Sequence, residues 1–146
     1  MKVKHLTPQF VESFPAKLEH GELYLAMEFG TAAHLCACGC GTKVITPFSP
    51  TDWQMSFDGE NVSLKPSVGN WAFPCRSHYW VRSGRIEWAG DMSQEAINAG
   101  RKRDRDAKAR ALAGKPGSNP QQPSPSAEPS LQAPSLLGKL RQWLGL

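Results

Sequence analysis

Three of the four cysteines stand on alternate residues in the stretch HLCACGCG, and the fourth follows in PCRSHYW. In an extended segment alternate residues face the same side, so Cys36, Cys38 and Cys40 are expected to share a side. The glycines at 39 and 41 let the backbone curl so that the sulfurs converge. Cys75 completes a set of four thiolates, which is typical of a structural zinc site.

Other roles for the thiols fit less well. Residues 1–15 contain no continuous apolar segment of a secretory signal, so we expect a cytoplasmic protein, and stable disulfides are rare in that compartment. Incidental buried thiols are disfavoured by three cysteines within five residues. One alternative stays open at this stage: Cys75 and His78 form a CxxH pair, so His78 is either a zinc ligand or free for catalysis.

A free His78 is a candidate general base, which needs a serine within hydrogen-bonding distance. Ser77 is a poor partner because neighbours in a strand face opposite ways. Ser67, in LKPSVGNW, is better placed, because the flanking proline and glycine predict a tight, exposed turn. The plainer interpretation is that Ser67 is a turn residue whose hydroxyl bonds to the local backbone.

Catalysis by a serine also needs donors for the oxyanion and a group that orients the base. The amides around Val68 and Gly69 are candidates for the first role. Asp52 and Glu28 are the carboxylates considered for the second. The tryptophans between residues 53 and 88 are interpreted first as core residues, although some can line a groove.

The elements that must position these residues are β-strands. Alternating or β-branched runs, separated by Gly-containing turns and by prolines, predict short antiparallel strands. The predicted fold is therefore mainly β: a small antiparallel meander with a zinc-stapled loop, followed by a basic helix. The predicted strands lie at 21–29, 43–46, 53–57, 61–64, 78–82 and 85–89.

The helix is predicted at 92–113, with Asp91 as its N-cap and Gln94 three residues later. Residues 101–110 hold six of the 17 basic and two of the 13 acidic residues, so the charges of the remaining chain cancel. A charged helix face is usually only solvated, and no aromatic residue is interleaved for base stacking. The sequence therefore argues against nucleic-acid binding.

Six of the twelve prolines fall within 115–135, and this composition predicts a disordered linker. After it, leucines and Trp143 recur at helical spacing opposite polar residues, which predicts a short amphipathic helix that contacts a protein or a membrane surface. The predicted organisation is a zinc-stapled β domain (1–91), a basic helix (92–113), a disordered linker (114–135) and an amphipathic helix (136–146).

With these residues in view, the chain resembles the small bacterial and phage proteins called BubE-like. Members of that family occur beside genes of bacterial ubiquitin-like conjugation pathways, and many others stand alone. Four motifs in order carry the resemblance, which covers roughly residues 20–90. The resemblance implies a serine-type peptidase that trims or removes a ubiquitin-like protein, with Ser67 and His78 catalytic and the four cysteines around zinc. The motifs are HLCACGCG (34–41), TPFSPTDW (46–53), SLKPSVGNW (63–71) and PCRSHYWV (74–81).

Two functional hypotheses therefore stand. The first is a peptidase with a structural zinc that acts on a ubiquitin-like protein or its conjugates. The second is a non-catalytic, zinc-stapled module or adaptor that binds protein. A structural role for the metal is favoured in both, because four thiolates neutralise the zinc charge and leave no open coordination position.

Overall fold

The computed structural model describes residues 1–114, which belong to one compact unit. The predicted terminal helix (136–146) and all but the first residue of the predicted linker (114–135) lie outside the described residues. The division into four segments stays a prediction.

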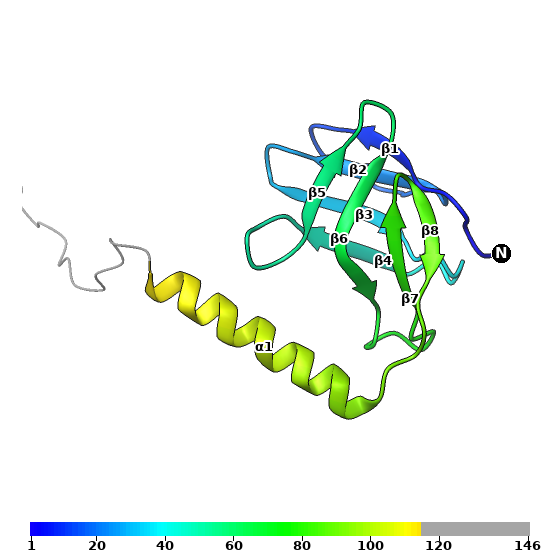
Figure 1. Cartoon of the computed structure of the whole chain (residues 1–146). Coiled ribbons are helices and arrows are strands. Elements are labelled where there is room, and N and C mark those ends of the chain that lie inside the picture. The colour runs from blue at the N-terminus through cyan, green and yellow to red at the C-terminus, as the bar shows by residue number, and fades with distance from the viewer. Residues whose placement is uncertain (115–146) are drawn as a thin grey trace, which may run out of the picture. The chain divides into compact units, whose positions relative to one another are not determined.

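The first half of the unit forms a four-stranded sheet with the strand order β1-β2-β3-β4 (Figure 1). β2, β3 and β4 pair antiparallel, whereas β1 pairs with β2 in parallel. The parallel pair is possible because residues 11–21 return the chain to the end of the sheet where β1 begins, so that β2 runs in the same direction as β1. The strands are β1 (Thr7–Phe10), β2 (Glu22–Ala26), β3 (Thr31–Leu35) and β4 (Lys43–Pro47).

The second half forms another four-stranded sheet, an antiparallel meander with the order β5-β6-β7-β8. Ser83 and Gly84 both have positive φ in the two-residue turn between the last two strands, which matches the twist of a hairpin. Two of the three connections of this meander, β5–β6 and β7–β8, were predicted as hairpins from their turn residues. The strands are β5 (Gln54–Phe57), β6 (Val62–Gly69), β7 (His78–Arg82) and β8 (Arg85–Trp88).

The hydrophobic core lies where the two sheets pack on each other. Alternate residues of β2, β6 and β7 point into it, as the period of two requires. The opposite face of the first sheet is covered by residues 11–18. The mainly β prediction is confirmed. The largest fully buried side chains of the core between the sheets are Leu6, Leu23, Leu25, Val62, Val68, Tyr79 and Val81.

Three details of the predicted fold were wrong. The predicted strand 21–29 is too long, because β2 ends at Ala26 and a turn follows it. Neither β1 nor β3 was predicted. Ser67 does not lie in a turn: β6 continues through it to Gly69, and a register shift in the pairing with β7 takes the place of the expected turn.

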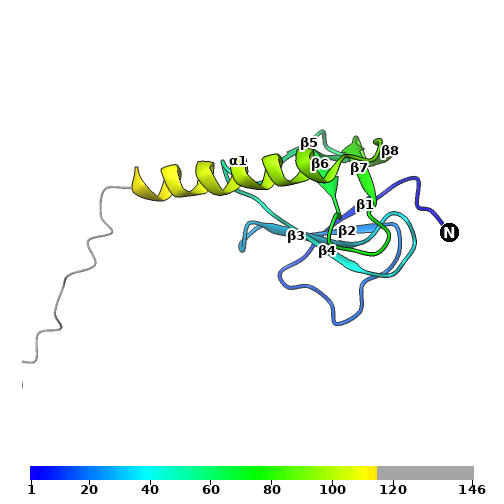
Figure 2. The same ribbon diagram turned by 90° about the horizontal axis from the view of Figure 1, so that it is seen from below.

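A single helix, α1 (Gln94–Ala113), follows the second sheet and lies beside it (Figure 2). Ser93, not the predicted Asp91, is the N-cap, since its hydroxyl accepts a hydrogen bond from the Ala96 amide. Ile97 is the buried residue of the helix, which is otherwise strongly charged. Among the described residues, no helix combines the length and apolarity needed to cross a bilayer.

Candidate functional site

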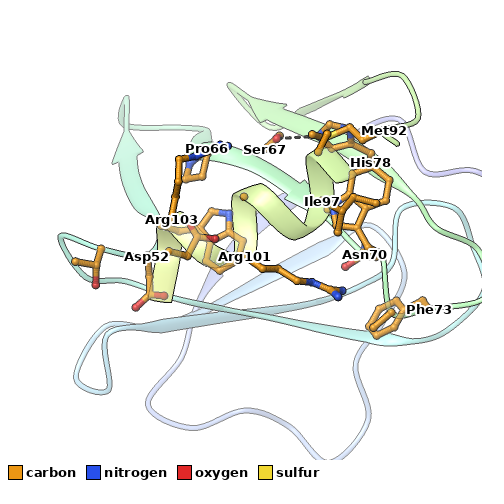
Figure 3. Close-up of a pocket in the computed structure, with 18 of the residues that line it drawn as sticks. Asp52, Pro66, Ser67, Asn70, Phe73, His78, Met92, Ile97, Arg101 and Arg103 are labelled. Atoms are coloured by element: carbon orange, nitrogen blue, oxygen red, sulfur yellow. Dashed lines mark hydrogen bonds between the residues drawn. The ribbon is translucent and has the colours of Figure 1, made fainter. Parts of the chain in front are cut away.

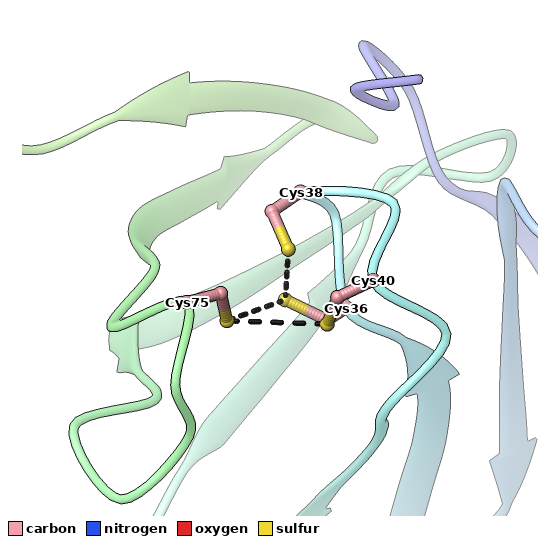
Figure 4. A group of neighbouring side chains, drawn as sticks. All are labelled: Cys36, Cys38, Cys40 and Cys75. Atoms are coloured by element: carbon pink, nitrogen blue, oxygen red, sulfur yellow. Dashed lines mark hydrogen bonds between the residues drawn. The ribbon is translucent and has the colours of Figure 1, made fainter.

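The four cysteine side chains converge at one end of the two sheets (Figure 4). Cys36, Cys38 and Cys40 lie on the loop between β3 and β4, and Cys75 lies on the loop between β6 and β7. All four sulfurs lie within 4.8 Å of one another, and three of the separations are 3.4, 3.9 and 3.9 Å. Sulfurs in a tetrahedron with metal bonds of about 2.3 Å are about 3.8 Å apart, so the four thiols fit a metal ion.

Polar groups lie close to the sulfurs. The Ser77 hydroxyl lies 3.0 Å from Cys36 Sγ, and the Asn70 side-chain amide donates to Ser77 Oγ at 2.9 Å. Hydrogen bonds with Thr42 lower the pKa of the Cys40 thiol to about 6, whereas burial raises the pKa of Cys38 to about 12. A bound dication holds all of its thiol ligands deprotonated, so it removes this difference.

The buried side chains of His34 and Tyr79 contact each other, and Tyr79 also contacts the backbone of the cysteine loop. The Tyr79 hydroxyl and His34 Nε2 form a hydrogen bond of 2.8 Å, and the Ala37 amide, between two of the cysteines, donates to the Tyr79 oxygen at 3.4 Å. Burial lowers the pKa of His34 to about 4 and raises the pKa of Tyr79 above its ordinary value, so both side chains are neutral. His34 thus stabilises the cysteine loop through Tyr79, without being a candidate ligand itself.

Ser67 and His78 meet on the outer face of the second sheet, away from the core (Figure 3). Ser67 Oγ lies 2.9 Å from His78 Nε2. The sheet explains this contact: His78 pairs with Gly69, and Ser67 is two residues earlier on the same face of β6. His78 is therefore not among the side chains that surround the sulfurs. Its role and that of Ser67 stay predictions.

A backbone carbonyl occupies the place expected for an orienting carboxylate. His78 Nδ1 lies 2.9 Å from the Gly90 oxygen, an acceptor, so Nδ1 carries the proton and Nε2 is free to accept from Ser67. The two carboxylates considered for this role were wrong. Asp52 accepts a hydrogen bond from Ser49 and pairs with Lys108, and Glu28 is exposed in the turn after β2.

The Trp71 indole packs against the His78 ring, with ring centroids 4.9 Å apart. It fits there because Gly69 has no side chain: a Cβ at this position would lie 2.5 Å from Trp71 Nε1. Trp71 therefore lines the site, so it is one of the tryptophans that contribute to a groove rather than to the core. The close approach explains why glycine stands at position 69.

Ser67 and His78 border a cavity of about 560 Å³ between the second sheet and α1 (Figure 3). One wall carries Ser67, Gly69 and His78, and the opposite wall comes from the first four turns of α1. The volume is in the range of ordinary ligand pockets. The residues of α1 that line the cavity are Ala96, Ile97, Gly100, Arg101, Arg103, Asp104 and Lys108.

The sequence did not reveal several residues of this site. Gly90 acts through its carbonyl, which every residue possesses, so no side-chain pattern indicates it. Lys108 was interpreted only as part of a solvated basic face, although its ion pair with Asp52 ties α1 to the sheet side of the cavity. The ion pair between Arg76 and Asp91 could have been predicted from the sequence. Their opposite charges lie just outside the two predicted strands of one hairpin, where the chain ends come together.

The sequence model of the family described as "bacterial ubiquitination-like system serine protease (BubE)" matches residues 10–89. The matched region includes the four cysteines, Ser67 and His78, and it ends one residue before Gly90. Neither the comparison with curated proteins nor that with solved structures yields a match. Since the match covers more than half of the 146 residues, the chain belongs to the BubE family of serine proteases from bacterial ubiquitination-like systems.

Proposed function

We propose that this protein is a serine peptidase that processes or removes a bacterial ubiquitin-like protein, with Ser67 as the nucleophile and His78 as the general base. The observation that carries the proposal is the chain of two hydrogen bonds, each 2.9 Å long, from Ser67 through His78 to the Gly90 carbonyl. Membership of a serine protease family supports the reaction class. The family's ubiquitination-like system supports the class of substrate.

The chemistry follows from the direction of the hydrogen bonds. Ser67 Oγ attacks the scissile carbonyl carbon while its proton passes to His78 Nε2. When the C–N bond breaks, His78 returns this proton to the leaving amine, and an ester joins the substrate's acyl group to Ser67. Water, deprotonated by the same nitrogen, then hydrolyses the ester and restores the serine.

The Gly90 carbonyl fixes the tautomer of His78 but carries no full charge. It therefore stabilises the imidazolium less than the carboxylate of a Ser-His-Asp triad does. The consequence is a dyad in which orientation of the base depends on the backbone geometry of residues 89–90. The Ala89 amide donates to the His78 oxygen at 2.9 Å, so the strand pairing itself contributes to this orientation.

In this proposal the substrate binds in the cavity beside Ser67. Pro66, Ser67 and Gly69 line it at the part of β6 beyond the last residue that pairs with β5, so an extended chain finds open backbone there. The tail of a ubiquitin-like protein is such an extended chain. In this proposal the basic and acidic side chains of α1 contact the substrate on the opposite wall.

The thiolate site has a structural role in this proposal, and zinc is the metal. Four sulfurs fill a tetrahedral shell, which leaves no position for a substrate or for a water nucleophile. Reduced thiolates also suit a cytoplasmic protein. The four ligands are Cys36, Cys38, Cys40 and Cys75.

The test uses the purified full chain and a ubiquitin-like precursor from the same genome. Ser67→Ala is expected to abolish cleavage while retaining the metal and the fold, because the hydroxyl carries the covalent step. His78→Ala is expected to do the same. Ser56→Ala, at an exposed serine on β5, is the matched control and should cleave like the wild type. A fluorophosphonate probe should label Ser67 alone, as peptide mass spectrometry can show.

The outcomes separate the alternatives. Cleavage by Ser67→Ala at the wild-type rate removes this serine from the chemistry. Loss of metal from His78→Ala makes the histidine a ligand. If the wild type neither cleaves nor reacts with the probe, the protein is a zinc-stapled binding module or adaptor.

A further inference from the structure

The thiolate site and the dyad are joined by one short segment, Cys75-Arg76-Ser77-His78. Cys75 points to the other sulfurs, Ser77 contacts Cys36, and His78 contacts Ser67. Arg76 is the residue of this segment with no role so far. Its side chain is 40% exposed.

The Arg76 guanidinium reaches across to the residues that follow Gly90. Its Nη2 lies 3.2 Å from Asp91 Oδ1 and 3.4 Å from the Met92 carbonyl oxygen. Asp91 Oδ1 also accepts a hydrogen bond from the Met92 amide at 2.9 Å. The Asp91 carboxylate and the Met92 carbonyl therefore lie close together as two acceptors for the Arg76 guanidinium. These contacts hold the chain immediately after the carbonyl that accepts from His78 Nδ1.

The same guanidinium also lies over the Trp71 ring, 5.5 Å from its centroid, in the range of a cation–π contact. Trp71 in turn packs against His78. The imidazole is therefore held from two directions, by the Gly90 carbonyl at Nδ1 and by the indole beside its ring. Arg76 contacts both supports.

We propose that Arg76 is a positioning residue for His78: it holds residues 90–92 and Trp71 so that the Nδ1–H tautomer, the form that can accept the Ser67 proton, predominates. The proposal rests on the proposed function in that it assigns His78 as the base. A metal bound by the four cysteines would hold the loop from which Arg76 extends.

The backbone of the loop agrees with this role. Arg76 has a φ of 43°, a region that non-glycine residues seldom adopt, so surrounding contacts must hold it there. The Arg76 amide donates to the Phe73 carbonyl at 3.0 Å, and the Asn70 amide donates to the Ser77 carbonyl at 2.8 Å. If Cys75 binds a metal, the backbone next to Arg76 would be held in place, and with it the start of the Arg76 side chain.

The experiment is nitrogen–proton NMR of the metal-loaded full chain with ¹⁵N-labelled histidine, since the two ring nitrogens report the tautomer directly. Wild-type His78 is expected to be protonated at Nδ1. In Arg76→Ala the signals should shift towards a mixture of tautomers. The rate at which the fluorophosphonate labels Ser67 should fall roughly tenfold, as expected for a misplaced base.

The chain offers a matched control. Arg82 lies on the same hairpin, 5.0 Å over the Trp80 ring, and pairs with Glu87 at 3.4 Å. Arg82→Ala thus removes the same kinds of contact far from Gly90, and the His78 signals should not change. Asp91→Ala removes one contact of Arg76 without altering the cysteine loop, so it should shift the tautomer in the same direction, by less.

An unchanged His78 tautomer in Arg76→Ala at full metal content overturns the proposal. If Arg76→Ala releases the metal, Asp91→Ala decides, and unchanged His78 signals in that variant overturn the proposal equally. Failure of the proposed function appears differently. In that case the wild type shows the Nδ1–H tautomer and its dependence on Arg76, but Ser67 is not labelled.

Discussion

Gly69→Ala tests whether the Trp71 indole is what makes glycine necessary beside the dyad. The new methyl carbon would lie 2.5 Å from Trp71 Nε1 and 2.9 Å from Cε2. Since carbon contacts are most favourable at about 3.5–4.0 Å, the indole must move by about 1 Å. Overpacking of this kind costs about 1–3 kcal/mol. Gly69 does not have a positive φ, so alanine itself is acceptable there and gains about 0.4–1 kcal/mol from the unfolded chain. The expected net loss of stability is about 1 kcal/mol.

The functional effect should exceed the effect on stability. The Trp71 ring packs on His78 at a centroid distance of 4.9 Å, so its displacement disturbs the base. A misplacement of about 1 Å near a reacting group can lower the rate by about a hundredfold. We therefore expect fluorophosphonate labelling of Ser67 to fall about tenfold to a hundredfold, with the metal content unchanged.

A double-mutant cycle separates this clash from a simple effect of the methyl group. Urea unfolding is measured for the wild type, Gly69→Ala, Trp71→Ala and the double variant. In the Trp71→Ala background Gly69→Ala should be neutral or stabilising, giving a coupling energy of about 1–3 kcal/mol. Equal destabilisation by Gly69→Ala in both backgrounds would refute the assignment of the clash to Trp71.

Three further predictions concern the supports of the site. Tyr79→Phe leaves His34 Nε2 without its hydrogen-bond partner and should destabilise the metal-loaded protein by about 1–3 kcal/mol in urea unfolding. A change near zero would contradict the contact. Hydrogen bonds with Lys108 and Ser49 lower the pKa of Asp52 below its ordinary 3.8. Asp52→Asn should therefore cost about 1 kcal/mol at neutral pH, and this difference should shrink as the pH falls through the lowered pKa of Asp52. A pH-independent difference in melting temperature would contradict the ion pair. Cys38→Ser should lower the metal content well below one per chain and abolish cooperative unfolding, and full metal binding by this variant would contradict a four-thiolate site.

The chemistry-bearing side chains were the part of the site that the sequence could indicate. Cysteines at alternate positions have few interpretations, and the structure brings Cys75 to the other three from a different sheet. Ser67 was selected on the wrong grounds, as a residue of an exposed turn. It lies instead in β6, two residues before Gly69, the residue that pairs with His78, so the Ser67–His78 contact runs diagonally between the two strands. The register of a strand pair depends on both strands, so neither strand's own sequence predicts it.

Contacts between distant segments were the other part that could not be predicted. Asp52 looked free to orient the base because its true partner, Lys108, is on a helix more than fifty residues away. β1 escaped notice because TPQF is short and contains proline, and it becomes a strand only by pairing with β2. The strand predicted at 21–29 ends early, at Ala26, because the chain then turns, and the turn includes Gly30 with a φ of 56° that only glycine adopts readily.

The position of the metal site explains what it contributes to so small a fold. The loop from β3 to β4 belongs to the first sheet and the loop from β6 to β7 belongs to the second, so a metal bound by both ties the two sheets together at one end. Small domains bury too little surface for the core alone to do this securely. Ser67 and His78, however, lie within one sheet and on adjacent strands. Their contact therefore depends on the metal only through the loop that starts β7, which is the loop that carries Arg76. Removal of the metal should then disturb the orientation of His78 before it separates Ser67 from His78.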